Sequence, residues 1–268
     1  MTSLVEKKPL RLIITGGGTG GHLFPGIAVA EAIMAERSGS EVLFIGTDRQ
    51  LDNQVLGQRP FMTASLQCQG LKGKSVAAIL GALVQLPRAL FKAGKILRRF
   101  KPDLVLGVGG YVTGPVVLAA KLLGIPTCIH EQNSIPGLAN KLLGYIANKI
   151  FVSLPGSEKY FPASKTILSG NPVRNTILKV SREAKPESGQ ESSTLLILGG
   201  SQGARRLNSL MLEAAENILS KLSPPPFIIH QTVGHDKNHV QRKYLELGLN
   251  ARVQYFFKEC HICLAIWR

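Results

Sequence analysis

The feature that most constrains the fold of this chain is a glycine-rich turn that occurs three times. The turns are GGGTGGH at 16–22, GVGGY at 107–111 and GGSQGA at 199–204. Each follows a short aliphatic run typical of a buried strand and precedes a stretch with the pattern of a helix. A strand that turns on glycines into a helix brings backbone N–H groups together at the helix N-terminus, and this geometry binds phosphate. The three turns therefore predict a protein that holds more than one phosphorylated ligand.

Strand and helix patterns alternate along the chain. Strands are predicted at 11–15, 41–46, 104–107, 127–130, 149–152, 194–198, 227–232 and 252–256, and helices at 25–37, 114–123, 137–147, 204–222 and 237–247. This alternation predicts an α/β protein with doubly wound parallel sheets, covered by helices on both faces. Pro25 is expected in the first turn of its helix, where its missing N–H costs nothing.

The chain is expected to form two domains. We assign 1–178 to the first, 179–193 to a linker and 194–268 to the second. The linker sequence, KVSREAKPESGQESS, is polar, contains proline and glycine, and has no periodic apolar face. The second domain is expected to be incomplete, because it offers about three strands where a doubly wound sheet has about five or six.

The composition indicates a globular protein. The chain has 268 residues, of which 44% are apolar, enough for a substantial core. No stretch approaches the roughly 18 to 20 apolar residues of a membrane span, and the N-terminus does not read as a signal peptide. Cys68, Cys128, Cys260 and Cys263 lack disulfide-framework spacing, which favours a reducing cytoplasm. The single C-x-x-C at Cys260 is weak evidence for zinc, and no metal site is predicted.

The net charge of +15 is concentrated in one segment. Residues 53–102 contain no acidic residue and nine basic ones, interspersed with aliphatic residues at helical spacing. This pattern predicts a basic amphipathic helix, with Pro87 at a break or at the helix start. It suits an anionic lipid surface, although it also fits the solvated face of an ordinary core helix. Nucleic acid ranks last, because the segment has few aromatic residues and no recognisable reading motif.

The first turn also satisfies a dinucleotide-binding fingerprint. Gly16, Gly18 and Gly21 match G-x-G-x-x-G, and Asp48 follows the second predicted strand, where such folds place an acid on the ribose. Taken alone, this favours a nicotinamide-dependent oxidoreductase, with a purely structural tight turn as the other interpretation. The fingerprint is short, however, and the same residues belong to a longer and more specific string.

Five motifs in fixed order carry a family resemblance. They are GGGTGGHLFPGIAVAEAI, GVGGYVTGP, HEQNSIPGLANKLL, SGNPVR and LLILGGSQGARRLN. Between about Arg11 and Phe257 the chain resembles the MurG family of glycosyltransferases. The resemblance implies a GT-B architecture, with two Rossmann-like domains facing across a cleft. It also implies inverting transfer of N-acetylglucosamine from UDP-N-acetylglucosamine (UDP-GlcNAc) to the undecaprenyl-pyrophosphoryl-MurNAc-pentapeptide called lipid I, which forms lipid II in peptidoglycan synthesis.

The resemblance also implies roles for individual residues. The acceptor diphosphate would be held by Gly16, Gly17, Gly18, Gly109, Gly110 and Tyr111, and the donor UDP-GlcNAc by Thr19, Gly20, Gly21, Asn133, Arg174, Ser201, Gln202 and Gly203. The reaction needs a base for the acceptor hydroxyl, and His22 is the candidate, with Glu131 competing. Without the family match, His22 reads as a helix cap or a core histidine, and Glu131 as a residue that orients a loop. No metal or other cofactor is expected, since Arg174 and helix dipoles can neutralise the leaving diphosphate.

The resemblance shifts the interpretation of the basic segment toward the membrane. The family docks through an apolar patch ringed by basic residues, which implies a peripheral protein on the cytoplasmic face of the inner membrane. The expected contacts to that anionic surface are Lys72, Lys74, Ile79, Leu80, Leu83, Arg88 and Lys92. Other cell-wall synthesis proteins are expected as partners, and nucleic acid is not.

The likeness is expected to end after Phe257. The tail, KECHICLAIWR, does not resemble the continuation of the family, and a truncated or frame-shifted reading frame accounts for it. The missing part normally supplies an acidic residue for the uridine ribose and glutamine contacts to the donor sugar. We therefore expect this polypeptide to be inactive. Two alternatives stay open at this stage: a nicotinamide-dependent oxidoreductase, and a non-catalytic remnant that binds a membrane surface.

Overall fold

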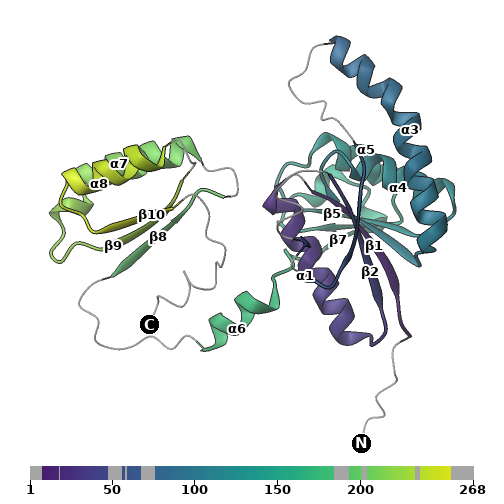
Figure 1. Cartoon of the computed structure of the whole chain (residues 1–268), viewed down its shortest axis with the longest axis horizontal. Coiled ribbons are helices and arrows are strands. Elements are labelled where there is room, and N and C mark those ends of the chain that lie inside the picture. The colour runs from purple at the N-terminus through teal and green to yellow at the C-terminus, as the bar shows by residue number, and fades with distance from the viewer. Residues whose placement is uncertain are drawn as a thin grey trace, which may run out of the picture. The chain divides into compact units, whose positions relative to one another are not determined.

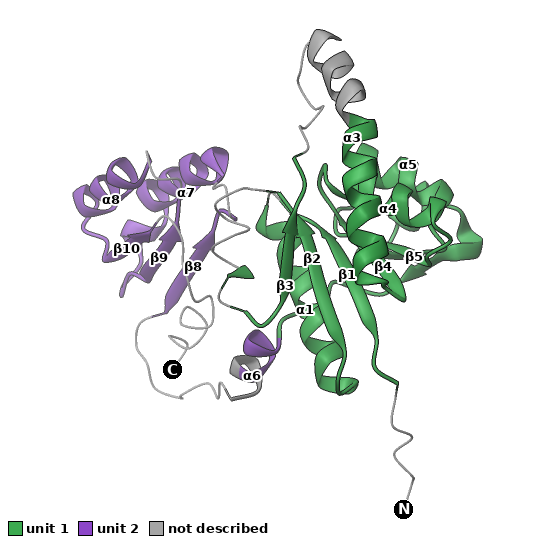
Figure 2. Cartoon of the chain, turned by 45° about the vertical axis from the view of Figure 1, so that its right-hand side comes forward, with its two compact units in different colours: residues 1–174 green, residues 175–268 purple. Residues whose placement is uncertain are grey.

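The computed structural model describes residues 8–17, 19–47, 56–57, 59–67, 76–183, 193–200, 204–232 and 236–254. The chain divides into two compact units, Met1–Arg174 and Asn175–Arg268, which Figure 2 distinguishes by colour. None of the helices in these ranges combines the length and apolarity needed to cross a bilayer. Each unit is described by itself below.

Unit 1 is built on a seven-stranded parallel sheet with the order β3-β2-β1-β4-β5-β6-β7. Figure 1 shows the whole chain, and Figure 2 shows β3, β2, β1, β4 and β5 side by side in this order. The strands are β1 (Arg11–Gly16), β2 (Glu41–Gly46), β3 (Met62–Ser65), β4 (Leu104–Gly109), β5 (Thr127–Glu131), β6 (Lys149–Val152) and β7 (Thr166–Leu168). The helices are α1 (Gly20–Glu36), α3 (Val76–Phe100), α4 (Thr113–Leu122) and α5 (Leu138–Ile146), with short 3-10 turns at η1 (Glu158–Tyr160) and η2 (Ala163–Lys165). The predicted doubly wound parallel sheet is confirmed.

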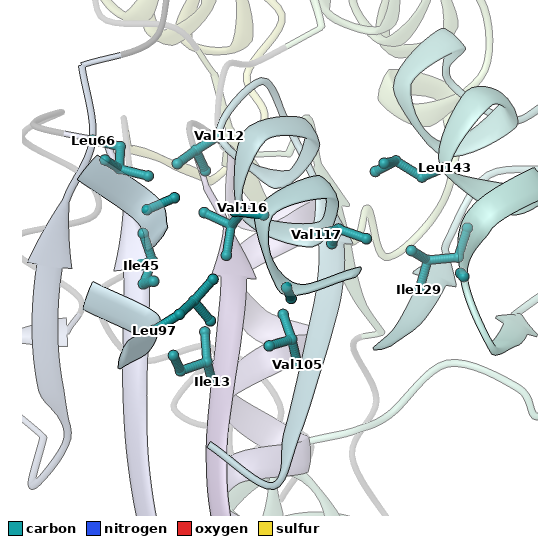
Figure 3. Packing of buried hydrophobic residues seen from close by; sticks show 14 of the residues in the cluster. Ile13, Ile45, Leu66, Leu97, Val105, Val112, Val116, Val117, Ile129 and Leu143 are labelled. Carbon is teal, nitrogen blue, oxygen red and sulfur yellow. The ribbon is translucent and has the colours of Figure 1, made fainter. Parts of the chain in front are cut away.

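Both faces of this sheet are apolar because successive residues of each strand point to opposite sides. Ile13, Val105 and Ile129 lie in the cluster that includes residues of α3, α4 and α5 (Figure 3). Their neighbours Leu12 and Leu106 lie in the second cluster, which includes residues of α1. Burial on both faces explains why these strands appear in the sequence as continuous aliphatic runs rather than as alternating ones.

The structure corrects the predicted positions of two prolines. Helix α1 begins at Gly20, directly out of the glycine turn, so Pro25 is a buried interior residue and not part of the first turn. Pro87 lies inside α3, so the expected break or start at this residue is wrong. Proline removes one helical hydrogen bond, but both helices continue because their apolar faces pack against the rest of unit 1. Close packing is clearest at Gly26, where an added Cβ would lie 2.9 Å from Cγ2 of Ile14.

Three short elements were missed by the sequence patterns. Strands β3 and β7 lie at the two edges of the sheet, and their residues are partly or largely exposed, so they lack the apolar run of the central strands. Helix α6 (Asn175–Glu183) opens unit 2 and covers the first residues of the predicted linker.

Unit 2 repeats the pattern on a smaller scale. Its described strands are β8 (Thr194–Leu198), β9 (Phe227–Gln231) and β10 (Ala251–Gln254), which form a parallel sheet with the order β10-β9-β8. Its helices are α6, α7 (Arg205–Asn217) and α8 (Lys237–Glu246), with a 3-10 turn at η3 (Leu219–Lys221). Ile197, Ile228 and Tyr244 anchor its core. This is the small second sheet that the sequence predicts.

Candidate active site

Two glycine turns of unit 1 pack directly against each other. Strands β1 and β4 are parallel neighbours, with Gly16 in register with Gly109, so their turns leave the same edge of the sheet. Gly110 has a φ of +89°, and a Cβ added there would lie 2.7 Å from the carbonyl oxygen of Gly17. Residues other than glycine rarely adopt this φ, and the space for a side chain is filled by backbone. The two turns therefore form a single interlocked backbone surface.

The imidazole of His22 lies against this surface. Gly109 has a φ of +104°, and its added Cβ would lie 2.7 Å from Nδ1 of His22. The ring occupies the place that any side chain at 109 would need. Thr113 ties the same turns together, because its hydroxyl lies 3.1 Å from the carbonyl oxygen of Thr15 and 2.8 Å from that of Gly109.

The N-termini of two helices open at this edge. Helix α1 follows the first turn and α4 follows the second, and neither has an acidic residue in its first turn or a side-chain cap. Helix N-termini carry partial positive charge, which stabilises a nearby anion. The interlocked turns and the two helix ends therefore suit a diphosphate group.

A chain of hydrogen bonds links His22 to the neighbouring strand β5. Oε1 of Gln132 lies 3.1 Å from Nδ1 of His22. The Nε2 atom of the same glutamine lies 3.0 Å from the carbonyl oxygen of Val108 and 2.9 Å from Nδ1 of His130. Gln132 thus connects two histidines from different elements.

His130 is buried and closes this chain. Its Nε2 lies 3.3 Å from the carbonyl oxygen of Gly170 and 3.2 Å from Oγ of Ser153. Burial lowers the pKa of His130 below its ordinary 6.5, and the Gly170 carbonyl and the charge of Glu131 only partly oppose this. The ring is therefore neutral at physiological pH.

Glu131 anchors the loop that follows β5. The side chain is 1% exposed, and its carboxylate accepts four hydrogen bonds. The donors are N of Asn133 at 2.9 Å, Nδ2 of Asn133 at 2.8 Å, Nδ2 of Asn140 at 2.9 Å and N of Gly137 at 3.2 Å. This arrangement fixes residues 132–137 and the start of α5.

Other predicted residues of unit 1 lie around the same edge. The guanidinium of Arg174 lies 4.1 Å from the ring centroid of Phe24, in the second turn of α1. This places a positive charge close to the helix that leaves the first glycine turn. Tyr111 is exposed after the second turn, and Asn133 is exposed beside Glu131.

Several predicted residues lie outside the described ranges. These are Gly18, Asp48, Lys72, Lys74, Ser201, Gln202, Gly203, Cys68, Cys260 and Cys263. Ile79, Leu80 and Leu83 lie in α3, and at these three positions only the backbone is described. Arg88 and Lys92 are exposed on the same helix, next to Phe91, which is 64% exposed. Within the described part of the chain, no group of three or more histidine, cysteine or acidic residues is placed to hold a metal ion.

The turn of unit 2 leads to a second polar network. Gly200, between β8 and α7, has a φ of +75°. Asn208 of α7 donates from Nδ2 to Oγ1 of Thr232 at 2.6 Å and to Oδ2 of Asp236 at 3.1 Å, while its Oδ1 lies 3.2 Å from Nε2 of His230. This buried asparagine ties the helix that follows the turn to β9 and to the start of α8.

Sequence reasoning singled out His22 and Glu131 but missed the residues that hold them. Gln132, which contacts His22, and Asn140, which contacts Glu131, were not assigned, although both lie inside the HEQNSIPGLANKLL motif. Ser153, which contacts His130, was not assigned either. The signal of Gln132 and Ser153 is polarity at the carboxyl end of a strand, where a parallel sheet places functional groups. Asn140 lies in α5 and has no such signal.

The fold and this edge define a class: an α/β protein with two Rossmann-like units whose glycine turns suit phosphorylated ligands. Two family descriptions match the sequence, the glycosyltransferase family 28 N-terminal domain over residues 12–152 and the glycosyltransferase family 28 C-terminal domain over residues 194–264. The second match continues beyond Phe257, where the resemblance was expected to end.

Named relatives specify the family further. A UDP-N-acetylglucosamine–N-acetylmuramyl-(pentapeptide) pyrophosphoryl-undecaprenol N-acetylglucosamine transferase from Desulfotalea psychrophila is 48% identical over 95% of this chain and 68% of its own length. The protein of the same name from Geotalea daltonii is 45% identical over 92% of this chain and 67% of its own length. The chain belongs to this family of glycosyltransferases, as the five motifs predicted.

Solved structures agree with this assignment. The crystal structure of Acinetobacter baumannii MurG has a TM-score of 0.68 and 30% identity, and the match covers 97% of this chain and 71% of that one. A UDP-GlcNAc 2-epimerase from Neisseria meningitidis has a TM-score of 0.64 at 16% identity, with 96% and 75% covered, and supports the fold alone. The predicted architecture of two Rossmann-like domains is confirmed.

Proposed function

We propose that this chain transfers N-acetylglucosamine from UDP-GlcNAc to the pyrophosphate-linked MurNAc-pentapeptide of a lipid acceptor, forming lipid II. The reaction is the one that names its relatives. The observation that carries the proposal to this chain is the interlocking of the turns at 16–22 and 107–111, with the His22 ring packed on Gly109. A backbone surface that binds diphosphate and touches an imidazole suits attack by the hydroxyl group of a pyrophosphate-bearing acceptor.

In this reaction His22 is the general base. The acceptor hydroxyl oxygen forms a bond to the anomeric carbon of N-acetylglucosamine as the bond from that carbon to UDP breaks. The hydroxyl proton passes to His22, and the electron pair of the broken bond leaves with UDP. A single displacement of this kind inverts the anomeric centre.

Glu131 acts as a positioning residue in this proposal and not as the competing base. A base needs a lone pair directed at substrate, whereas the Glu131 carboxylate is buried and accepts four hydrogen bonds from its own loop. Its role is to hold Asn133 in place. Among the described residues, the half-buried His22 has one side-chain hydrogen-bond partner, Gln132.

The remaining residues are assigned to the two substrates. Gly16, Gly17, Gly18, Gly109, Gly110 and Tyr111 bind the acceptor diphosphate, and Thr19, Gly20, Gly21, Asn133, Arg174, Ser201, Gln202 and Gly203 bind UDP-GlcNAc. The position of Arg174 over Phe24 supports its assignment, because it places a fixed cation close to α1. The charge of the leaving diphosphate is neutralised by this arginine and by helix N-termini, so the proposal involves no metal or other cofactor.

The proposal places the chain on the cytoplasmic face of the inner membrane as a peripheral protein. Support comes from the exposed part of α3, where Phe91 stands beside Arg88, Lys92 and Lys95. The ammonium of Lys95 lies 4.7 Å from the centroid of the Phe91 ring. An exposed aromatic ring among basic residues suits insertion between anionic headgroups. Lys72, Lys74, Ile79, Leu80 and Leu83 are assigned to the same contact, and other cell-wall synthesis proteins are proposed as partners.

Transfer of radiolabelled N-acetylglucosamine tests the activity. The 268-residue chain is expected to label the lipid acceptor, and His22→Asn to lower kcat by about 100-fold or more, as expected for loss of a general base. Chelation of divalent metal is expected to leave the rate unchanged. The sequence-based expectation that this polypeptide is inactive predicts no labelling instead, so the assay decides between that expectation and the present proposal.

Ligand screening separates the alternatives. UDP-GlcNAc and the acceptor should each raise the melting temperature, because ligands that bind the folded state stabilise it. Stabilisation by NADH instead would favour an oxidoreductase. Binding to vesicles without any response to UDP-GlcNAc would favour a non-catalytic membrane-binding remnant.

Vesicle flotation tests the membrane contact. The chain should float with vesicles that contain anionic lipid and should be released as salt is raised, because salt screens the basic residues. Replacing Phe91 and Lys92 together by serine should weaken flotation. The matched control replaces exposed Leu245 and Arg242 of α8, which also form an apolar and basic pair. Equal weakening by both pairs would contradict the assignment to α3.

A further inference from the structure

The orientation of the Gln132 side chain is fixed by its surroundings. Its Nε2 atom lies 3.0 Å from the carbonyl oxygen of Val108 and 3.2 Å from that of His130. Carbonyl oxygens only accept hydrogen bonds, so the donating amide nitrogen must face them. The amide oxygen Oε1 is therefore the atom that lies 3.1 Å from Nδ1 of His22.

This orientation determines where His22 carries its proton. An amide oxygen cannot donate, so Nδ1 of His22 must carry the hydrogen that bonds it. In a neutral imidazole the second nitrogen is then unprotonated. Nε2 of His22 is thus the nitrogen with the free lone pair, which is the state that a general base requires.

The same reasoning applies to His130 on the other side of Gln132. The amide nitrogen of Gln132 lies 2.9 Å from Nδ1 of His130, so this ring nitrogen accepts. The proton of His130 then lies on Nε2, which faces the carbonyl oxygen of Gly170 and the hydroxyl of Ser153. A protonated His130 would place an N–H against the amide nitrogen, and burial of this ring, which lowers its pKa, opposes that state.

We propose that Gln132 is a positioning residue that fixes the tautomer of His22, with neutral His130 holding the glutamine amide in the required orientation. The direction of hydrogen bonding is continuous along the chain: His130 donates to Gly170, Gln132 donates to His130, and His22 donates to Gln132. The inference rests on the proposed role of His22 as general base. It adds that the reactive nitrogen is Nε2 and that the glutamine after Glu131 selects it.

Nitrogen-15 NMR of the full chain with labelled histidine tests the tautomer directly. A neutral imidazole gives distinct signals for its protonated and unprotonated nitrogens, and His22→Asn identifies the His22 signals. We expect Nε2 of His22 to be the unprotonated nitrogen. In Gln132→Met, which keeps a similar volume but cannot hydrogen-bond in this way, the signals should shift toward a mixture of tautomers.

The matched control is Gln241→Met in unit 2. Gln241 also bridges two groups, because its Nε2 donates to the carbonyl oxygen of Ala251 at 3.0 Å and its Oε1 accepts from N of Val253 at 3.2 Å. This substitution should leave the His22 tautomer unchanged. In turnover assays Gln132→Met should lower kcat on the order of tenfold or more, with KM for both substrates little changed.

Failure of this inference differs from failure of the proposed function. A His22 protonated on Nε2 in the unsubstituted chain, or a tautomer unaffected by Gln132→Met, would overturn the inference even if His22→Asn abolished transfer. If His22→Asn instead left transfer intact, the function of His22 would be wrong, whatever the NMR signals showed.

Discussion

Each unit contains a strand that passes through a glycine turn into a helix, but the surroundings of these turns differ. In unit 1, β1 lies between β2 and β4, so its turn packs against the β4 turn, and a Cβ on Gly110 would collide with Gly17. In unit 2, β8 pairs only with β9 among the described strands, and a Cβ on Gly200 would meet no described atom within 4 Å. Both glycines have positive φ, at +89° and +75°. At Gly200 glycine is favoured only by the positive φ. At Gly110 it is favoured both by the positive φ and by the lack of room for a Cβ atom.

The largest expected effect comes from alanine at Gly110, with alanine at Gly200 as the comparison. Gly110→Ala should lower the free energy of unfolding of unit 1 by about 2 to 5 kcal/mol, because it adds a backbone collision to an unfavourable φ. Gly200→Ala should cost unit 2 only about 1 to 2 kcal/mol. Hydrogen exchange under increasing urea measures both, because peptides report on each unit separately.

Gly124→Ala is the control for this comparison. Gly124 lies in unit 1 with a φ of +72°, and its added Cβ would meet nothing within 4 Å. It should therefore behave like Gly200→Ala. Equal losses for Gly110→Ala and Gly124→Ala would show that the turns are not interlocked.

The next effect concerns the buried polar residue at the centre of each unit's network. Glu131→Ala leaves the donors of its loop unpaired. Asn208→Ala removes the donor to the Thr232 hydroxyl and the partner of Nε2 of His230. Each should cost about 2 to 4 kcal/mol. Exchange should accelerate in 132–137 for the first variant and around Thr232 for the second. Asn217→Ala, which removes an exposed bond to the carbonyl of Glu213, is the control and should change little. Acceleration in the wrong segment would contradict the assigned networks.

Acid should destabilise unit 2 through His230. Burial lowers the pKa of His230 from 6.5 to about 4, because the charged ring loses its hydration. Between these values the unfolded chain binds a proton that the folded chain does not. The free energy of unfolding is therefore fully retained above pH 6.5 and falls as pH is lowered toward 4, by about 3 kcal/mol in total. Unit 1 should respond less, since the Gly170 carbonyl and Glu131 partly offset the burial of His130.

Urea unfolding across this pH range checks the prediction. His230→Gln should flatten the pH dependence of unit 2, whereas replacement of His239, which is exposed on α8, should preserve it. A unit 2 stability that is constant from pH 6.5 to 4 would contradict burial of a neutral His230.

The smallest effect is expected at ion pairs. Lys243 and Glu246 lie 2.9 Å apart on α8 with half of each side chain exposed, so Glu246→Gln should leave stability unchanged within error. The pair of Arg59 and Glu31 in unit 1 is less exposed, and Glu31→Gln should cost on the order of 1 kcal/mol. A larger loss at Glu246 than at Glu31 would reverse this order.

The sequence predicted the elements whose signals are local. Central strands such as β1 and β4 were found because burial on both faces makes them continuous aliphatic runs, and the glycine turns because few residues tolerate their φ. The edge strands β3 and β7 were missed because exposure removes that signal. The helical positions of Pro25 and Pro87 were missed because tertiary packing outweighed a local preference.

The sequence indicated individual candidate residues but not the contacts between them. The family motifs indicated His22, yet its contact with Gly109 joins residues far apart in sequence and depends on the register of β1 with β4. Gln132 was not identified, because its role depends on two carbonyl oxygens and two histidines that only the folded sheet brings together. The sequence left open whether His22 or Glu131 is the general base. The burial and the hydrogen bonds of Glu131 are the reason for proposing His22.

The central claim is that the interlocked turns bind the acceptor diphosphate. Hydrogen exchange with and without a short-chain analogue of the pyrophosphate-linked acceptor tests this claim most directly. Amides of both 16–22 and 107–113 should become protected together when the analogue binds, in the unsubstituted chain and in His22→Asn. Protection of neither segment at saturating analogue, or of one without the other, would contradict the account.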